Sequence, residues 1–416
     1  MSSDLRAESR RRFLQFLAAS PLLAASGAIA ETLLPHTKLP DPLTWAPLDP
    51  AALIKTPKEA INVFDFEPVA RQNVPPAHFG YMASGIDDEV TLRANREGFL
   101  KFQLRPRRLI DVSKVDMTTD ILGVKYSSPI VIAPTGGNRA YHPDGELAVA
   151  RAAKAGNHLD ILSTPASASI EDVTAARGAP IWHQLYATSS WDVAKAMVTR
   201  VEKAGALAVA VTVDRSGGRN QETFFRLRRA DTRDCKACHD NSSVQGMARA
   251  RPIMDGIDVS SLKSLQSSNM TWDFMKRLRD HTKMKIVVKG ILAHEDATMA
   301  VQNGIDAIIV SNHGGRGEDS GRSTIDALPE ILEAVNGRMP VLVDSGFRRG
   351  TDIAKALAMG ANAVCIGRPY LWGLGAFGQA GVEGVLDLLR EELSGVMQQM
   401  GAPTIKHLVP AMVRRA

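Results

Sequence analysis

The stretch "AIIVSNHGGRG", residues 307–317, decides the fold of this chain. An apolar, largely β-branched run leads directly into a polar, glycine-rich turn, which is typical of a strand buried on both faces of a parallel sheet. Seven other runs have the same form, and each of the eight is followed by a segment with helical periodicity. The eight runs are residues 130–134, 160–164, 181–186, 208–214, 286–290, 307–315, 340–346 and 363–369.

Eight strand–helix units in roughly 250 residues predict an α/β protein with a (β/α)8 TIM barrel. A doubly wound open sheet is the alternative, although that fold rarely needs eight such regular units. The interval between Asp214 and Ile286 is about twice as long as the others. We therefore expect an insertion after the fourth strand, about residues 215–285, that forms a lid.

The chain before the barrel has three parts. Residues 1–30 contain "SRRRFL" and an apolar run that ends in "AIA", which resembles a cleavable twin-arginine export signal and predicts a periplasmic protein. An ordinary secretory signal and a retained membrane anchor are the alternatives. Residues 31–60 are rich in proline and predict an extended lead-in. A helical N-terminal segment is then expected to open the main domain, residues 61–416.

Composition excludes some classes of function and leaves one question open. The net charge of +5 is modest and no basic patch is interleaved with aromatic residues, so no nucleic-acid partner is expected. The chain has three cysteines. Cys365 lies in the apolar run "AVCIG" and is expected to be a buried packing residue. Cys235 and Cys238 belong to "CKACH" in the predicted lid.

Polar residues gather at the predicted carboxyl ends of the strands, where barrels of this kind carry their chemistry. One such residue is more often a helix cap than a catalyst, but a dozen at one end of the barrel indicate a site. In "SNHGGRG", His313 and Arg316 flank glycines, so a guanidinium could bind a carboxylate beside an imidazole that acts as a base. The full set is Thr135, Ser163, Gln184, Tyr186, Thr212, Asp214, Lys289, His313, Arg316, Asp344, Arg348 and Arg368.

The loops after the last two strands predict a phosphate site. "DSGFRRG" and "IGRP" offer the backbone N–H groups of Gly346 and Gly367 and the cations of Arg348 and Arg368. These loops are the usual phosphate site of such barrels, and helix N-termini would add their dipoles. The residues alone thus predict a barrel enzyme with a phosphate-bearing cofactor and a carboxylate substrate.

The chain resembles the FMN-dependent L-2-hydroxy acid dehydrogenase and oxidase family over about residues 60–410. The resemblance rests on "YMASG", "IAPTG", "HPDGE", "QLY", "TVD", "VKG" and "IGRP" in family order, and above all on "SNHGGR" with "DSGFRRGTDIAKALAMGA". The family includes glycolate oxidases, lactate dehydrogenases and mandelate dehydrogenases. It implies FMN as the cofactor, a 2-hydroxy acid as the substrate and a homo-oligomer, commonly a tetramer.

The resemblance also implies roles for single residues. His313 would be the base, Asp214 would stabilise its imidazolium form, and Lys289 would favour the anionic reduced flavin. Arg316, Tyr81 and Tyr186 would bind the substrate carboxylate and hydroxyl. Contacts to the flavin ring are implied for Thr135, Ser163, Gln184 and Thr212, and contacts to the ribityl phosphate for Ser311, Asp344, Gly346, Arg348, Gly367 and Arg368.

Three positions depart from the family pattern. Gln221 stands where many members have a substrate-binding arginine, and Arg219, two residues earlier, is a candidate substitute. Pro165 stands where glycolate oxidases have a tryptophan, and Gly136 where many members have alanine near the flavin. These departures are compatible with oxidation of a 2-hydroxy acid, but they leave open which side chain the substrate carries. L-Lactate is the first expectation.

The stretch "CKACH" has the C-x-x-C-H form to which haem is attached in c-type cytochromes. Covalent haem would use Cys235 and Cys238 as thioether donors and His239 as the iron ligand, with Met247 or Met254 as a possible second ligand. A Cys235–Cys238 disulfide or free thiols, and coincidence, are the alternatives. In flavocytochrome members of the family, reduced flavin passes electrons to a haem.

The expected function is therefore FMN-dependent oxidation of an L-2-hydroxy acid with transfer of electrons to a soluble or membrane cytochrome c-type acceptor, as in an L-lactate dehydrogenase (cytochrome). An oxidase that uses O2 and makes hydrogen peroxide is the alternative within the family. A flavin-binding module without catalysis is the alternative outside it.

Overall fold

The computed structural model describes residues 48–215, 217–233 and 243–416. The predicted export signal, the first part of the proline-rich lead-in and the "CKACH" stretch lie outside these residues. No helix among the described residues is long and apolar enough to span a membrane.

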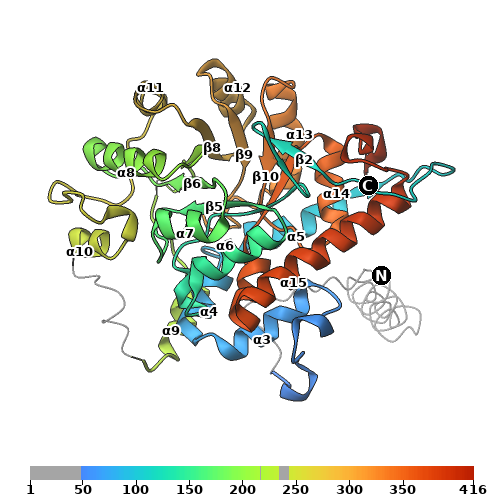
Figure 1. Cartoon of the computed structure of the whole chain (residues 1–416), viewed down its shortest axis with the longest axis horizontal. Helices are drawn as coiled ribbons and strands as arrows, with labels where there is room; N and C mark the ends of the chain where they lie inside the picture. The colour runs from blue at the N-terminus through green and yellow to red at the C-terminus, as the bar shows by residue number, and fades with distance from the viewer. Residues whose placement is uncertain (1–47, 216, 234–242) are drawn as a thin grey trace, which may run out of the picture. The chain divides into compact units, whose positions relative to one another are not determined.

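Eight parallel strands close into a barrel with the strand order β10-β11-β4-β5-β6-β7-β8-β9 (Figure 1). All eight strands predicted from the sequence are confirmed, and with them the (β/α)8 fold. Their bounds are β4 Ile130–Ile132, β5 Leu159–Ser163, β6 Trp182–Leu185, β7 Ala208–Thr212, β8 Lys285–Ile291, β9 Ala307–Val310, β10 Val341–Val343 and β11 Ala363–Ile366.

Alternate residues of these strands fill the interior of the barrel. Trp182 and Leu159 pack there among smaller residues, and the Cys365 side chain is 1% exposed in the same cluster, which confirms its predicted packing role. A hairpin of β2 Thr119–Ile121 and β3 Val124–Tyr126 adds Ile121 to the cluster. The hairpin therefore packs against the end of the barrel at which the strands begin and leaves the opposite end for chemistry.

The helices that follow the strands form the outer layer. Ser169 and Ser323 begin two of them, because each hydroxyl accepts a hydrogen bond from the backbone N–H three residues later. The outer helices are α6 Gly145–Ala155, α7 Ile170–Arg177, α8 Trp191–Lys203, α11 Trp272–His281, α12 His294–Gln302, α13 Thr324–Val335, α14 Gly350–Met359 and α15 Arg368–Met400, the last with non-helical backbone at Phe377 and Gly378.

The segment before the barrel is helical, as predicted. It contains the short 3₁₀ turns η1 Pro50–Ala52, η2 Pro57–Glu59, η3 Val63–Asp65 and η4 Gly98–Lys101 and the helices α3 Phe66–Asn73, α4 Pro76–Ala83 and α5 Val90–Glu97. Figure 1 shows α3, in blue, beside α15, in red, and the two helices are in contact. Within residues 48–60 the extended lead-in is interrupted by η1 and η2, because proline at the first position suits such a turn.

Short elements complete the described chain. β1 Phe102–Leu104 pairs antiparallel with β12 Val413–Arg415, so the C-terminal residues lie beside the segment that follows the N-terminal helices. The remaining 3₁₀ turns are η5 Asn138–Ala140, η7 Ile405–His407 and η8 Pro410–Met412.

The insertion after the fourth barrel strand is shorter than the sequence suggested. The expected range 215–285 includes α11, which leads directly into β8 and is the barrel's own helix. The insertion is therefore the β7–α11 segment, residues 213–271, and it contains α9 Glu222–Arg229, α10 Val244–Arg249 and η6 Pro252–Met254. The range expected from the sequence ran from one strand to the next and therefore included α11.

Candidate active site

The turn after β9 places His313 at the carboxyl end of the barrel strands. His313 has φ 60°, and Gly314 and Gly315 have φ 71° and 74°, so three successive residues adopt the left-handed conformation. Glycine adopts it without strain, whereas a histidine there must be held by its contacts. The backbone N–H of His313 donates to the Ser311 hydroxyl at 3.0 Å, which holds the turn.

The imidazole of His313 connects two other predicted site residues. Its Nδ1 lies 2.7 Å from Oδ1 of Asp214, just after β7, and its Nε2 lies 3.2 Å from the hydroxyl of Tyr186, just after β6. Burial lowers the pKa of His313 to about 4, although Asp214 works in the opposite direction. The imidazole is therefore neutral at pH 7 and can accept a proton at Nε2.

Lys289, on β8, is a buried cation between two carboxylates. Its Nζ lies 3.1 Å from Asp344 and 3.8 Å from Asp214, and it donates to Ser311 at 2.6 Å. Burial alone would lower the pKa of Lys289, but Asp344 and Asp214 outweigh burial and hold the pKa above its ordinary value. Lys289 therefore provides a fixed positive charge at the centre of the strand ends.

Arginine side chains surround the two tyrosines of the site. The Arg316 guanidinium lies 4.5 Å from the ring centroid of Tyr81 and donates to the Ser84 carbonyl at 2.8 Å. Burial lowers the pKa of Arg219 to about 10, and repulsion from Arg215 and Arg316 adds to this. Desolvation of the hydroxyl would raise the pKa of Tyr81, whose side chain is otherwise exposed, but Arg316, Arg215 and Arg219 together lower it. The potential at this position is thus strongly positive and suits an anion.

Polar atoms without partners lie at the ends of the neighbouring strands. Gln184 accepts a hydrogen bond from Ser163 at 2.7 Å, but its Nε2 is buried and has no partner among the described residues. The same holds for the Thr212 hydroxyl. Thr135 is hydrogen-bonded to Tyr370 and, at 3.0 Å, to Asn138. Buried polar groups are nearly always paired, so these unpaired atoms indicate a bound polar ligand.

The loop after β10 contains a buried cation that has no carboxylate within ion-pair distance among the described residues. Arg348 stacks at 4.7 Å on the Trp372 ring and donates to the carbonyl of Phe347 at 2.9 Å. Burial holds its pKa well below the ordinary range, and the neighbouring Arg96 and Arg368 lower it further. Arg368 donates to the carbonyls of Met82, Gly314 and Ser84 at 3.0, 2.8 and 2.9 Å. Cations that repel each other here would be stabilised by a phosphate.

Residues 70–415 match the FMN-dependent dehydrogenase family. The chain belongs to this family. It is 40% identical over 359 residues to a peroxisomal (S)-2-hydroxyacid oxidase of Arabidopsis thaliana, covering 86% of this chain and 97% of that protein. It is 40% identical over 358 residues to glycolate oxidase 1 of Zea mays, covering 84% of this chain and 96% of that protein.

Solved structures agree with the sequence comparison. A variant of mandelate oxidase with 2-hydroxy-phenylacetamide has a TM-score of 0.74 at 34% identity and covers 85% of this chain and 98% of its own. A variant of flavocytochrome b2 with pyruvate bound has a TM-score of 0.76 at 33% identity and covers 86% of this chain and 87% of its own. The barrel and its site are thus those of an FMN-dependent enzyme family.

The residues present fit FMN. The unpaired amide of Gln184 and the hydroxyl of Thr212 supply hydrogen-bonding groups at the strand ends for a polar ring system. Arg348 supplies a buried positive charge for a phosphate, in the loop where such barrels usually bind one. Ser311, Asp344, Gly346 and Gly367 lie at the ends of β9, β10 and β11 between these two regions. When bound, FMN supplies the acceptor for two electrons.

The two departures near the flavin site, Gly136 and Pro165, depend on each other. A Cβ atom at Gly136 would lie 2.5 Å from Cγ of Pro165, so a side chain at residue 136 is incompatible with the proline. Glycine at one position is therefore the consequence of proline at the other. The third departure, Gln221, is buried, and its Nε2 donates to the Ser84 hydroxyl at 3.1 Å. The same hydroxyl accepts a hydrogen bond from Arg316 at 3.1 Å.

Sequence reasoning missed three residues of the site. Arg215 lies 5.2 Å from the ring centroid of Tyr186, Arg251 lies near both site tyrosines, and Tyr370 is hydrogen-bonded to Thr135. Arg215 directly follows Asp214 and could have been found from its place at a strand end. Arg251 follows α10 in the β7–α11 segment, where no periodicity indicates which side chains face the barrel.

Proposed function

We propose that this protein uses FMN to oxidise an L-2-hydroxy acid to the 2-oxo acid. The observation that carries the proposal is the His313–Asp214 pair of 2.7 Å beside Tyr186 and the arginines, at the end of the strands where the flavin contacts gather. A neutral imidazole next to a carboxylate-binding cation is what removal of a proton from a 2-hydroxy acid requires. L-Lactate is the first substrate to test.

Each side chain of the site has a proposed role in the reaction. Arg316 and Tyr81 bind the substrate carboxylate, and Tyr186 holds the hydroxyl near Nε2 of His313. The imidazole accepts a proton from the substrate, and Asp214, whose own pKa is lowered by His313 and Lys289 in spite of burial, stays ionised and stabilises the imidazolium. Lys289 contributes a fixed positive charge where electrons arrive. Arg219 adds positive charge beside Tyr81.

The electron acceptor that we propose is a c-type cytochrome. The support is the export-like sequence of residues 1–30 and the C-x-x-C-H form of residues 235–239, which would carry a covalent haem in a periplasmic enzyme. Location in the periplasm is part of this proposal. Assembly as a homo-oligomer is a further part, supported by the family resemblance alone.

A specific observation favours a second candidate, an oxidase that passes electrons to O2. The Arabidopsis and maize relatives, each 40% identical to this chain, carry the name oxidase. The two candidates share the first half of the reaction and differ only in the second.

Anaerobic bleaching of the flavin by L-2-hydroxy acids tests the shared half of the reaction. The holoenzyme should lose its oxidised-flavin absorbance with an L-acid and keep it with the D-enantiomer. The reduced enzyme is then mixed with oxidised cytochrome c or with O2, and the faster reoxidation identifies the acceptor. A flavin that no 2-hydroxy acid bleaches would show the protein to be a flavin-binding module without this activity.

A further inference from the structure

We propose that Arg215 and Arg251 form a second anion subsite beside His313, so that the preferred substrate is a 2-hydroxy acid with a second carboxylate on its side chain. The inference rests on the function proposed above and names its substrate class. If the inference holds, a 2-hydroxy dicarboxylate binds more tightly than L-lactate, the first substrate to test for the proposed function.

Arg215 is held directly over the catalytic group. Its guanidinium lies 5.2 Å from the Tyr186 ring centroid, and Nη1 donates to the Tyr186 hydroxyl at 3.4 Å. In the amide orientation that satisfies both residues, Gln266 accepts from Nη2 at 2.9 Å and donates to the Arg215 carbonyl at 3.1 Å. Nε of Arg215 is buried without a partner among the described residues. The guanidinium is thus fixed in place, and it forms no ion pair with any residue that the structure describes.

Arg251 approaches the same tyrosines from the β7–α11 segment. Burial lowers its pKa, the nearby Tyr186 and Tyr81 raise it, and Arg215 lowers it. Its Nη1 is also buried without a hydrogen-bond partner among the described residues. Arg215 is thus placed by its contacts with Tyr186, and Arg251 adds a second positive charge that acts on the same tyrosines.

The positive charge at this end exceeds what one carboxylate needs. Arg215, Arg219, Arg251 and Arg316 gather around the two tyrosines, and none of the four has an ion-pair partner in the part of the chain that the structure describes. Asp214 is nearby, but His313 and Lys289 already engage it. A half-buried group of like charges is costly unless an anion compensates it.

Neither of the other expected anions compensates this group. The cofactor phosphate would be bound in the loop after β10, where Arg348 lies. The first carboxylate of the substrate is matched by Arg316, with Arg219 in place of the second substrate-binding arginine of the family. Arg215 and Arg251 remain for an anion on the substrate's side chain.

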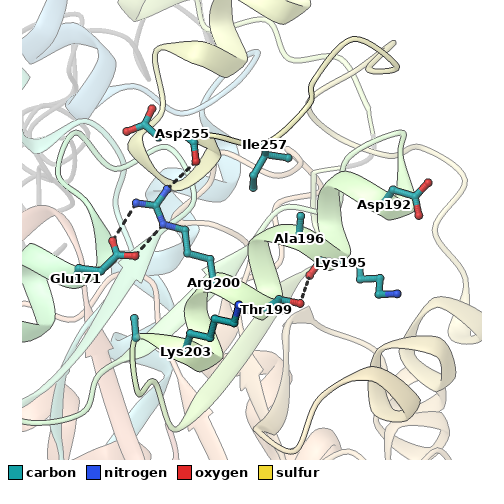
Figure 2. Close-up of a pocket in the computed structure, with 10 residues that line it drawn as sticks. Glu171, Asp192, Lys195, Ala196, Thr199, Arg200, Lys203, Asp255 and Ile257 are labelled. Carbon is teal, nitrogen blue, oxygen red and sulfur yellow. Dashed lines mark hydrogen bonds and ion pairs between the residues drawn. The ribbon is translucent and has the colours of Figure 1, made fainter.

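The β7–α11 segment is fastened so that Arg251 keeps its position. Figure 2 shows Arg200, on the outer helix α8, between Glu171 and the backbone of Asp255. Its guanidinium binds Glu171 with two contacts of 2.8 and 3.1 Å and donates to the carbonyls of Pro252 and Asp255 at 2.5 and 3.3 Å. Because Pro252 directly follows Arg251, this clamp fixes the backbone that presents the guanidinium.

The test compares acids of equal chain length with and without the second charge. Anaerobic bleaching of the flavin in the holoenzyme is measured against the concentration of L-malate and of L-2-hydroxybutyrate. The apparent Kd for L-malate should be lower by about tenfold or more, the effect expected of a charge-assisted hydrogen bond. Arg251→Gln and Arg215→Gln should each raise the apparent Kd for L-malate more than that for L-2-hydroxybutyrate, so that the ratio of the two values moves towards one. The matched control is Arg249→Gln, an exposed arginine on α10, which should retain the preference.

Three outcomes distinguish the two proposals. A wild-type preference for L-malate that either glutamine variant removes supports the subsite. Equal or weaker binding of L-malate, with the flavin still bleached by L-2-hydroxybutyrate, overturns the subsite and leaves the proposed function intact. A flavin that neither acid bleaches overturns both. FMN content and circular dichroism of each variant identify one that has failed to fold, and Arg251→Lys then serves as a second variant that should keep the preference.

Discussion

Two requirements meet at His313: its backbone is left-handed and its side chain is the proposed base. Asparagine tolerates this conformation better than alanine, so His313→Asn removes the base with little added strain. We predict that flavin bleaching slows by about 10²–10⁴-fold, the usual contribution of a general base. Rapid anaerobic mixing with the substrate measures the rate. FMN content should equal that of the wild type, and an unchanged rate would refute the assignment of the base.

The pH profile follows from the same residue. The pKa of His313 is lowered to about 4, mainly by burial, so the imidazole is neutral and competent at any pH well above that value. We predict that kcat/KM is flat through neutral pH and falls only as the pH approaches about 4. Asp214→Asn removes the group that raises this pKa, so the fall should move to still lower pH while the rate drops. A fall centred near 6.5, the pKa of a free histidine, would contradict this prediction.

Gly136 and Pro165 should be coupled energetically. A Cβ at residue 136 would lie 2.5 Å from Cγ and 3.1 Å from Cβ of Pro165. We predict that Gly136→Ala lowers the free energy of unfolding by about 1–3 kcal/mol, as overpacking does. The same change in a Pro165→Ala background should cost less, because Cγ is gone. Urea unfolding of the four proteins of this cycle measures the coupling, and purely additive effects would refute it.

At the residue scale, the sequence was enough to predict candidate catalytic residues, but not which side chains surround them. His313, Asp214, Lys289 and Arg316 each end a strand, and the structure brings them together. Arg251 could not be found, because its approach to Tyr186 depends on how the β7–α11 segment folds back, which no local pattern encodes. The link between Gly136 and Pro165 also needs three-dimensional distances.

Among the elements, α15 depends on a close approach across its kink. The backbone is non-helical at Phe377 and Gly378, and the two halves meet at Gly373 and Gly381. A Cβ at Gly381 would overlap the carbonyl of Gly373, which is backbone and cannot rotate away. The long helix therefore folds back on itself only because both positions lack a side chain.

This contact gives a prediction with its own control. Gly381→Ala should lower the free energy of unfolding by about 1–3 kcal/mol or more, since relief requires the backbone to move. Gly395→Ala, in the same helix, has nothing within 4 Å of the added Cβ and should stabilise by up to about 1 kcal/mol. Thermal or urea unfolding of both variants checks the opposite signs. Equal effects would show that the contact at the kink does not matter.

Helices and strands could be predicted where the same strand–helix unit repeats along the sequence. The barrel strands were found because both their faces are buried and most of them are largely apolar runs. The end of the insertion was not found, because α11 is amphipathic with a polar exterior and follows a long non-periodic stretch. The same limit applies to η1 and η2, which are single turns begun by proline.

At the scale of the whole molecule, the open question is where the electrons go. Residues 235–239 lie in the β7–α11 segment, the same segment that supplies Arg215, Arg219 and Arg251 to the substrate end of the barrel. A haem attached there would belong to the segment nearest the substrate. Of the two methionines considered as a second iron ligand, Met254 is only 2% exposed among the described residues, so Met247 is the better candidate.

The last prediction concerns the chain produced with residues 1–30, the proposed export signal, in a periplasm that matures c-type cytochromes. We predict that the purified protein shows a haem Soret band besides the flavin bands, and that anaerobic addition of an L-2-hydroxy acid reduces both groups. Cys235→Ser and Cys238→Ser should each weaken or abolish the Soret band, because each removes a thioether donor, while flavin bleaching stays intact. Cys365→Ser is the matched control, since that thiol is buried in the barrel. A flavin-only spectrum that still bleaches would reduce "CKACH" to a disulfide or a coincidence, and would favour O2 or a separate cytochrome as the acceptor.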